Sequence, residues 1–449
     1  MPSFKLVNLK GDLFATGFCF GLETLIRLVS SLILTRIVRP DAYGVITIML
    51  SITFVIEMIS DINVSVFIVR DQHAEEPRYL NTAWTIRLAR SVMNSAILFL
   101  LAPLIASSLY NTPILTVPLR VFSISFIIGA LQSMSFPLAI RRKQARYVMY
   151  TELAAGAGGA VCSVIFCYFL RDYWGMIYGI LVNKALNSAF SYVFYRDVRP
   201  SVRFDWASAR EILKFAKFNT PSSLLTLAMS QFDKVVFLRL FDLTKLGVYG
   251  LAANIAGSIV ALISKTSQSV LYARCAHTFR TDRENLRQKY YSENVKLFIG
   301  ILFLPAAIGG AAHFIIALLY PSRYEEAGAI LQAFMLHATL LGLGSPAEDL
   351  LIAIGEYQVI LHGNIYRAVA LLVGSLAGYY FFGFMGFVYG AALSTLPPLI
   401  YYLRLQKKHG LLTVRYESYK AAFALGVWTT TYVISSALLA FFPHILIRH

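Results

Sequence analysis

The sequence predicts an all-α, polytopic membrane protein made of two parallel six-helix lobes and one additional helix. Apolar runs of about 20 residues follow one another along the chain, and a helix of that length crosses a hydrocarbon core about 30 Å thick. Of the 449 residues, 57% are hydrophobic and 14% are charged, and the mean hydropathy is +0.62. Because little of the chain lies outside the apolar runs, we expect its function to lie inside the membrane.

The apolar runs define thirteen expected spans that are separated by short loops. They cover residues 12–36, 42–68, 83–109, 114–138, 148–170, 174–195, 214–238, 246–272, 295–319, 327–352, 359–382, 384–404 and 419–446. The first run ends in Leu-Thr-Arg at 34–36, without the small-residue site at which a signal peptide is cleaved. We therefore expect this run to remain as the first helix.

Lysine and arginine are distributed unequally between alternate loops. If the N-terminus lies in the cytoplasm, the loops on the cytoplasmic side carry 25 of these residues and the outer loops carry 7. Cytoplasmic loops of membrane proteins are enriched in Lys and Arg. The expected orientation therefore has the N-terminus inside, and the excess of 40 basic over 24 acidic residues is explained largely by this topology.

The two halves of the chain resemble each other near the end of the first expected helix of each half. The segment 34–45 aligns without a gap with the segment that ends at Val248, which places Arg36 on Arg239 and Gly44 on Gly247. Six spans separate the two copies, so both begin on the same side of the membrane. We expect two parallel lobes related by an axis along the membrane normal.

A basic, amphipathic linker is expected between the lobes. The boundaries are 1–195 for the first lobe, 196–217 for the linker, 218–405 for the second lobe, and 406–449 for a basic loop and the additional helix. The apolar residues that would place the linker on the inner membrane surface are Trp206, Ile212, Leu213 and Phe215.

Several charged residues fall within the expected spans, where each costs about 2.5–3.5 kcal/mol at the bilayer centre. We expect these residues to face one another or a water-filled cavity. The basic candidates for an anion-binding cavity are Arg27, Arg87, Arg90, Lys184, Lys234 and Lys265. The carboxylates that are candidates for coupling transport to an ion are Glu23, Asp61 and Asp233.

Structural explanations compete with a binding role at some of these positions. Glu23 and Arg27 lie one helical turn apart and can form an ion pair. Arg87 and Arg90 lie on one face of a helix and can extend to the lipid headgroups. Asp61 can be solvated at the inner interface.

The neighbours of the remaining candidates carry further information. Lys184 is flanked by two asparagines, and Lys265 lies in a run of Ser, Thr and Gln, so both positions favour the lining of a cavity. Asp233 and Lys234 are adjacent in sequence, and their side chains point about 100° apart on a helix, so they do not face each other.

Motifs along the chain resemble those of a known transporter family. They are the segment 34–45, the segment Asp61–Arg70, Phe-Asn-Thr-Pro-Ser at 218–222, Phe-Asp-Lys at 232–234 and Leu-Gly-Val-Tyr-Gly at 246–250. In this order they resemble the polysaccharide-transporter branch of the MOP flippases, the Wzx-type exporters, over residues 8–405. The glycine that usually follows the aspartate at position 61 in that family is absent here.

The resemblance implies a MATE-like fold and a transport function. It implies a flippase that translocates undecaprenyl-pyrophosphate-linked oligosaccharides, the repeat units of exopolysaccharide or O-antigen, across the bacterial inner membrane. Transport would proceed by alternating access, driven by an ion gradient or the membrane potential. The implied partners are the lipid-linked oligosaccharide, membrane lipids, and a polysaccharide polymerase and export complex. The alternative within the same fold is a MATE-like multidrug or cation antiporter, although basic residues prevail over carboxylates here.

Other classes of function are not favoured. The expected outer loops are too short to carry a catalytic apparatus, so we do not expect an enzyme, and no GxxxxGK[ST] loop for a nucleotide is present. The four cysteines lie in or beside apolar runs without metal-ligand spacing, which predicts neither a metal site nor disulfides. We expect no cofactor and no nucleic-acid partner.

Overall fold

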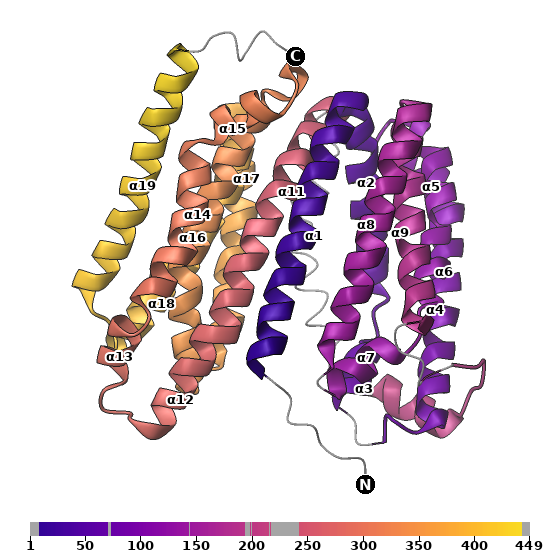
Figure 1. Ribbon diagram of the computed structural model, residues 1–449, viewed down its shortest axis with the longest axis horizontal. Coiled ribbons are helices and arrows are strands. Elements are labelled where there is room, and N and C mark those ends of the chain that lie inside the picture. Colours follow the sequence, from indigo (N-terminus) through magenta and orange to yellow (C-terminus); the bar gives the residue numbers. More distant parts are fainter. Residues whose placement is uncertain are drawn as a thin grey trace. The chain divides into compact units, whose positions relative to one another are not determined.

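The computed structural model describes residues 9–70, 73–142, 144–193, 198, 200–214, 216 and 242–441. Within these residues the regular structure is helical throughout, which confirms the all-α fold class (Figure 1). The chain divides into two compact units, Met1–Gly247 and Val248–His449. Each unit is described by itself below.

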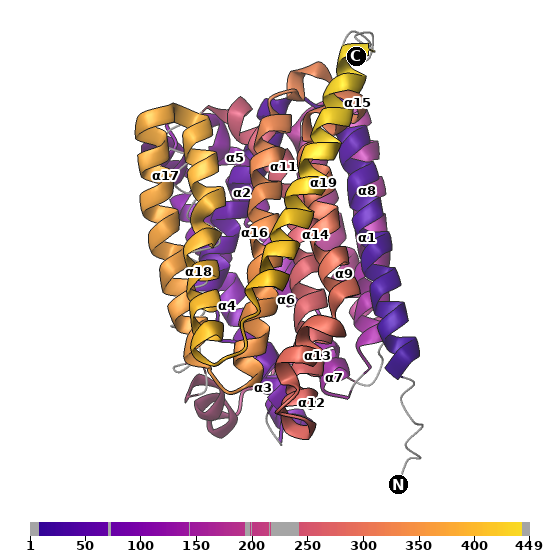
Figure 2. The same ribbon diagram turned by 90° about the vertical axis from the view of Figure 1, so that its left-hand side faces the viewer.

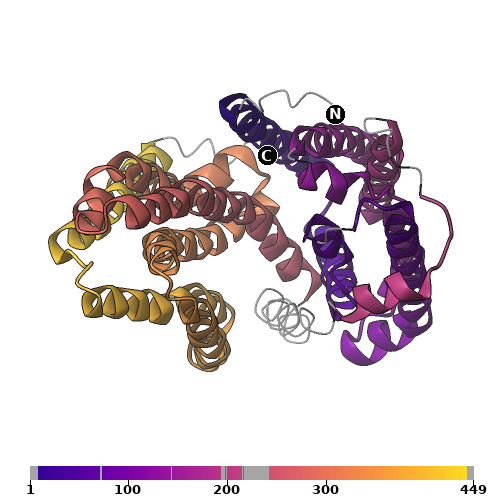
Figure 3. The ribbon, with the colours of Figure 1, turned by 90° about the horizontal axis from the view of Figure 1, so that it is seen from below.

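The first unit contains nine of the labelled helices (Figure 1). They are α1 (Leu9–Ile37), α2 (Pro40–Ile59), α3 (Val64–Arg70), α4 (Pro77–Leu104), α5 (Thr116–Phe122), α6 (Ile124–Ala130), α7 (Ser135–Arg141), α8 (Ala145–Leu170) and α9 (Tyr173–Val193). A π-helical turn, Ile105–Leu109, extends α4, and a short 3-10 turn, Pro113–Leu115, precedes α5. Helix α8 packs along α1 on one side and along α9 on the other (Figures 1 and 3).

The second unit contains most of α11, which begins at the end of the first unit, and the helices that follow it (Figures 1 and 2). They are α11 (Leu243–Thr266), α12 (Ala273–Thr281), α13 (Leu286–Ser292), α14 (Val295–Gly310), α15 (Ala312–Leu319), α16 (Ala327–Ala353), α17 (Gln358–Ala392), α18 (Leu396–Lys408) and α19 (Val414–Phe441). Shorter turns lie at Ser267–Tyr272, Ser322–Tyr324 and Leu393–Thr395. The expected additional helix is α19, and it packs against α14.

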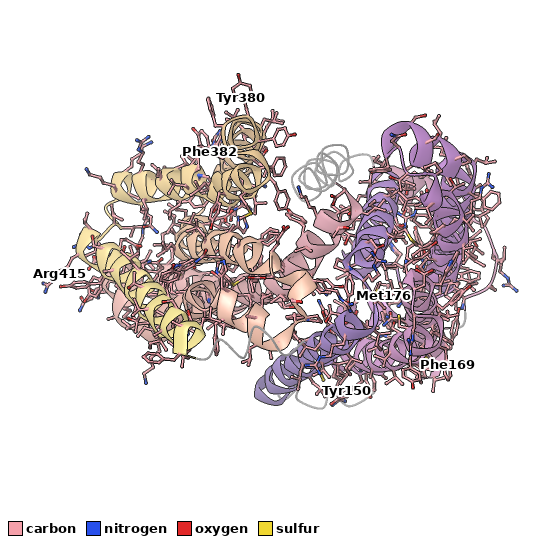
Figure 4. The ribbon with its side chains drawn as sticks, turned by 90° about the horizontal axis from the view of Figure 1, so that it is seen from above. Tyr150, Phe169, Met176, Tyr380, Phe382 and Arg415 are labelled. Atoms are coloured by element: carbon pink, nitrogen blue, oxygen red, sulfur yellow. The ribbon has the colours of Figure 1, made fainter. Side chains whose placement is uncertain are left out.

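The described residues contain eight helical segments that are long and apolar enough to cross a membrane, or nine if the bent pair α13–α14 forms one span. Many large apolar side chains on these segments are exposed, as expected for helices that contact lipid. Tyr380 and Phe382 on α17 are 82% and 79% exposed and project from the body of their unit (Figure 4). The span expected at 214–238 lies outside the described residues except for Lys214 and Ala216.

Several of the expected spans are interrupted, and two of the interruptions shape the candidate site described below. The span expected at 42–68 ends as α2 at Ile59 and resumes as α3, because Asn63 adopts a left-handed conformation with φ of 53°. The span expected at 114–138 is divided into several short helices, with a break between Ala130 and Ser135. Both breaks leave backbone carbonyls at helix ends without an intrahelical partner.

The linker between the expected lobes is attached to the first unit. The backbone N–H groups of Ser201, Arg203 and Asp205 donate to side-chain oxygens of α4, at donor–acceptor distances of 2.9, 3.2 and 3.0 Å. The acceptors are Asn81 Oδ1, Thr85 Oγ1 and Thr82 Oγ1, respectively. Residues 206–214 then form a helix in which Ile212 is fully buried, whereas Trp206 is 70% exposed. Ile212 therefore faces the protein core and does not share an exposed face with Trp206.

A carboxylate outside the spans stabilises the connection between α3 and α4. Glu75 Oε2 accepts a hydrogen bond of 2.9 Å from Arg142 Nη2, and Arg141 Nε lies 3.5 Å from Glu75 Oε1. The hydrogen bond from Arg142, with the charge of both guanidinium groups, lowers the pKa of Glu75 below its ordinary value. The ionised form of this side chain is therefore favoured by folding.

We expect Glu75→Gln to destabilise the protein slightly at neutral pH. The Glu75 side chain is 42% exposed, so we expect the free energy of unfolding to fall by about 0.5 kcal/mol. Because the pKa is lowered in the folded state, the stabilisation is present above the unfolded-state pKa and disappears as the pH falls through the folded-state pKa. Thermal unfolding in detergent at pH 7 and at pH 3 measures the difference. A gap between wild type and variant that grows on acidification would contradict this explanation.

Candidate cationic cavity of the first unit

Three of the predicted basic residues line one cavity in the first unit. The cavity has a volume of about 220 Å³, and its wall includes Arg87 and Arg90 from α4 and Lys184 from α9. The carboxylate on the same wall is Glu57 of α2. The excess of cationic over anionic side chains makes this cavity suited to an anion.

The lining of the cavity follows from residue spacing on α4 and from small and polar residues on the neighbouring elements. Arg87 and Arg90 are three residues apart and therefore lie on one face of α4. Gly129 and Ala130, at the end of α6, add small residues to the lining of the cavity. Gln132 and Asn187 complete the polar lining, and the Gln132 amide donates a hydrogen bond of 3.0 Å to Asn187 Oδ1.

Arg87 is held at the end of a broken helix. Its Nη2 donates to the carbonyl oxygen of Ala130 at 3.1 Å and also to that of Gln132. Carbonyl groups at the C-terminal end of a helix carry partial negative charge, which favours a cation there. Its Nε is buried and has no hydrogen-bond partner among the described residues.

Arg90 is held at the end of α2. Its Nη1 donates to Asp61 Oδ1 at 2.9 Å and to the carbonyl oxygen of Ser60 at 3.3 Å. On the same side, Asn94 Nδ2 donates to Ser60 Oγ at 2.7 Å. The Arg90 side chain is only 15% exposed, and its Nε also lacks a hydrogen-bond partner in the described chain.

Lys184 differs from the two arginines. Its Nζ lies 5.9 Å from the centre of the Phe122 ring, a cation–π contact, and it makes no hydrogen bond or ion pair of 4 Å or less within the described residues. The neighbouring Asn183 donates to the carbonyl oxygen of Ala155 at 3.2 Å and thereby connects α9 to α8. Lys184 is therefore the cation on the cavity wall with the most unused hydrogen-bonding capacity.

The other predicted site residues lie elsewhere or outside the described chain. Glu23 and Arg27 form the ion pair that their spacing predicts, at 3.1 Å, with side chains 37% and 42% exposed. Lys265 is exposed on α11, in the second unit. Asp233 and Lys234 lie outside the described residues.

The structure also shows a buried carboxylate that the site prediction did not include. Asp349 on α16 is 6% exposed and accepts a hydrogen bond of 2.5 Å from Ser267 Oγ. The signal in the sequence is the pair Glu348-Asp349 within an otherwise apolar segment. In the described residues, no three His, Cys, Asp or Glu side chains are placed to hold a metal ion, and all four cysteines are free.

Comparison with known proteins agrees with this architecture. The family described as "Polysaccharide biosynthesis protein" matches residues 33–329. The lipopolysaccharide biosynthesis protein WzxC of Escherichia coli (strain K12) is 23% identical over 387 residues, which cover 86% of this chain and 77% of WzxC. The succinoglycan biosynthesis transport protein ExoT of Rhizobium meliloti (strain 1021) is 22% identical over 351 residues, 78% of this chain and 69% of ExoT. Among solved structures, the lipid II flippase MurJ in an inward closed conformation has a TM-score of 0.70 at 14% identity, covering 97% of this chain and 99% of that one.

Together, the apolar helices and these similarities define a multi-pass membrane transporter and not an enzyme. The family match covers more than half of the sequence. The chain belongs to the polysaccharide biosynthesis protein family, and the resemblance to Wzx-type transporters that the sequence motifs indicate is confirmed.

Proposed function

We propose that this protein is a flippase for undecaprenyl-pyrophosphate-linked oligosaccharides, the repeat units of an exopolysaccharide or O-antigen. It would act by alternating access in the bacterial inner membrane, with its N-terminus in the cytoplasm. The observation that carries the proposal is the cavity lined by Arg87, Arg90 and Lys184. The names of the relatives, a succinoglycan transport protein and a lipid II flippase, support the same class of substrate.

The chemistry of the cavity suits a pyrophosphate. A pyrophosphate that links a prenyl chain to a sugar carries two negative charges, and these must be stabilised away from water. Charge-assisted hydrogen bonds from lysine and arginine provide this stabilisation. Lys184 Nζ and the Nε atoms of Arg87 and Arg90 are donors without hydrogen-bond partners among the described residues.

The alternative function, a multidrug or cation antiporter, is less well supported. A site for cationic compounds requires carboxylates without partners of opposite charge. The wall of the described cavity contains one carboxylate, Glu57, and three cationic side chains. The charge balance therefore favours an anionic substrate.

We propose that transport is driven by an ion gradient or by the membrane potential. An inside-negative potential favours outward movement of the substrate by about 2.3 kcal/mol per charge per 100 mV. The candidate coupling carboxylates are Glu23, Asp61 and Asp233, and the burial of Asp349 adds a fourth. Arg27, Lys234 and Lys265 remain candidates for further contacts with the substrate. A polysaccharide polymerase and export complex is the expected partner on the outer side.

Reconstitution into proteoliposomes tests the proposed function. A prenyl-pyrophosphate-linked oligosaccharide with a fluorescent sugar is placed in both leaflets, and a membrane-impermeant quencher reports the sugar in the outer leaflet. We expect the protein to accelerate exchange of this lipid between leaflets, but not transport of ethidium. Transport of ethidium without exchange of the glycolipid would favour the antiporter.

The expected topology gives a separate prediction. A single cysteine introduced at Arg283, in a chain without its four native cysteines, should react with a membrane-impermeant maleimide only from the cytoplasmic side. A cysteine at Arg323 should react only from the outside, because one expected span, 295–319, lies between the two loops. Labelling of intact and permeabilised spheroplasts measures this difference. Reaction of both positions from the same side would contradict the proposed orientation.

A further inference from the structure

The counter-ion of Arg90 distinguishes it from the other cations of the cavity. Arg90 lies on the cavity wall, and its partner Asp61 is not among the lining residues. Within the described residues, Arg87 is held by neutral carbonyl groups, and Lys184 is in contact with an aromatic ring. Of the three cations, Arg90 is thus the one that forms an ion pair with a carboxylate among the described residues, at 2.9 Å from Asp61.

Asp61 is positioned by its own backbone and not only by Arg90. Its Oδ1 accepts a hydrogen bond of 3.0 Å from the backbone N–H of Asn63, two residues later, which is an Asx turn. This turn contains the left-handed Asn63 that separates α2 from α3. The carboxylate is therefore held beside Arg90 by the break between these helices.

A fixed carboxylate beside Arg90 competes with any anion that approaches Arg90 from the cavity. A ligand that binds Arg90 Nη1 must replace Asp61 there, and a ligand that binds the unpartnered Nε still meets the opposing charge of Asp61 on the same guanidinium group. The apparent dissociation constant then equals the intrinsic one divided by the fraction of molecules in which Arg90 is available. A lower affinity of this kind also speeds the release of the ligand, which a transporter needs at the end of each cycle.

We propose that Asp61 is an affinity-setting residue, which competes with the pyrophosphate group for Arg90 and so permits its release. This inference rests on the proposed function, because it assumes that the cavity binds a pyrophosphate. Replacement of Asp61 should therefore change the binding affinity in the direction opposite to replacement of a residue that only supports the fold. Loss of a supporting residue weakens binding, whereas loss of a competitor strengthens it.

The test measures binding of farnesyl pyrophosphate to the purified full chain in detergent, by displacement of a fluorescent analogue. We expect Asp61→Asn to bind the probe about fivefold more tightly than wild type, because one competing charge is removed from a partly exposed pair. Asparagine can still accept the Asn63 N–H. Asp61→Glu, which keeps the charge, should bind with an affinity close to that of wild type.

A double-variant comparison assigns the effect to Arg90. In the background of Arg90→Gln, Asp61→Asn should no longer increase affinity, since no guanidinium group remains to be released. In proteoliposomes, Asp61→Asn should also lower the turnover of the flipped lipid at saturating substrate. Tighter binding together with slower turnover is a combination that a loss of structure does not produce.

The outcomes separate this inference from the proposed function. If Lys184→Ala weakens probe binding but Asp61→Asn leaves it unchanged or weaker, the competitor role is wrong and the binding cavity stands. If wild type does not bind the probe and Lys184→Ala has no effect, the proposed function fails first. If Asp61→Asn is not recovered as folded protein, Asp61→Ser, whose hydroxyl can accept the same N–H, is measured against the same expectations.

Discussion

Replacement of Lys184 by alanine should reduce the affinity of the first-unit cavity for farnesyl pyrophosphate by at least about tenfold and should reduce glycolipid flipping to a similar extent. A charge-assisted hydrogen bond contributes about 1.5–3 kcal/mol, and about 1.4 kcal/mol corresponds to a factor of ten. The expected effect is large because Lys184 has no described hydrogen bond or ion pair to compensate its charge in the free protein. A ligand therefore does not have to displace a described partner of Lys184 in order to bind it.

Two further variants make this experiment specific. Lys408→Ala removes an exposed lysine from the last turn of α18 and controls for a general loss of positive charge. It should leave both affinity and flipping unchanged. Lys184→Arg keeps the charge and should retain part of the affinity, since a guanidinium group differs in shape from an ammonium group. Equal activity of Lys184→Ala and wild type at equal protein levels would remove the main support for an anion site in this cavity.

Much of the fold could be predicted from the sequence, because the length of an apolar run is a strong and local signal for a membrane-spanning helix. The helices α8, α9, α16 and α19 lie close to their expected ranges. The interruptions could not be predicted in the same way. The break after Ile59 depends on a left-handed Asn63, and asparagine is one of the few non-glycine residues that tolerate this conformation. The polar residues Ser60, Asp61 and Asn63 lower the hydropathy locally, but they do not specify where the helix ends.

Charge within an apolar run is likewise a local signal, and it indicates candidate site residues but not their partners. Because intramembrane charge is costly, the sequence singles out Arg87, Arg90 and Lys184, and the structure places all three on the wall of one cavity. The partners of these residues are set by tertiary structure. Asp61 and Arg90 are 29 positions apart, and their contact depends on how α2 ends beside α4. The burial of Asp349 likewise follows from the packing of α16 and not from its neighbours in sequence.

The largest expected effect on stability is at the crossing of the two arms of α17. The helix reverses at Gly383, whose φ of 63° and ψ of −144° are suited to glycine, and the two arms then pack backbone to backbone. A Cβ atom on Gly378 would lie 2.1 Å from the carbonyl oxygen of Gly386, and one on Gly374 would lie 3.0 Å from that of Gly390. Small residues of this kind allow helices to approach closely in membranes, where packing rather than hydrophobic burial drives association.

We expect Gly378→Leu to destabilise the second unit by about 3 kcal/mol, at the upper end of the cost of overpacking, because the obstructing atom belongs to the backbone and cannot rotate away. The matched control is Gly257→Leu on α11, where a Cβ atom would meet nothing within 4 Å. Thermal unfolding of both purified variants in detergent measures the difference, and the control should unfold close to wild type. Gly378→Ala should show an intermediate loss, because a single methyl group forces a smaller separation of the arms. If Gly378→Leu and Gly257→Leu unfold at the same temperature, the arms of α17 are not packed as closely as the structure shows.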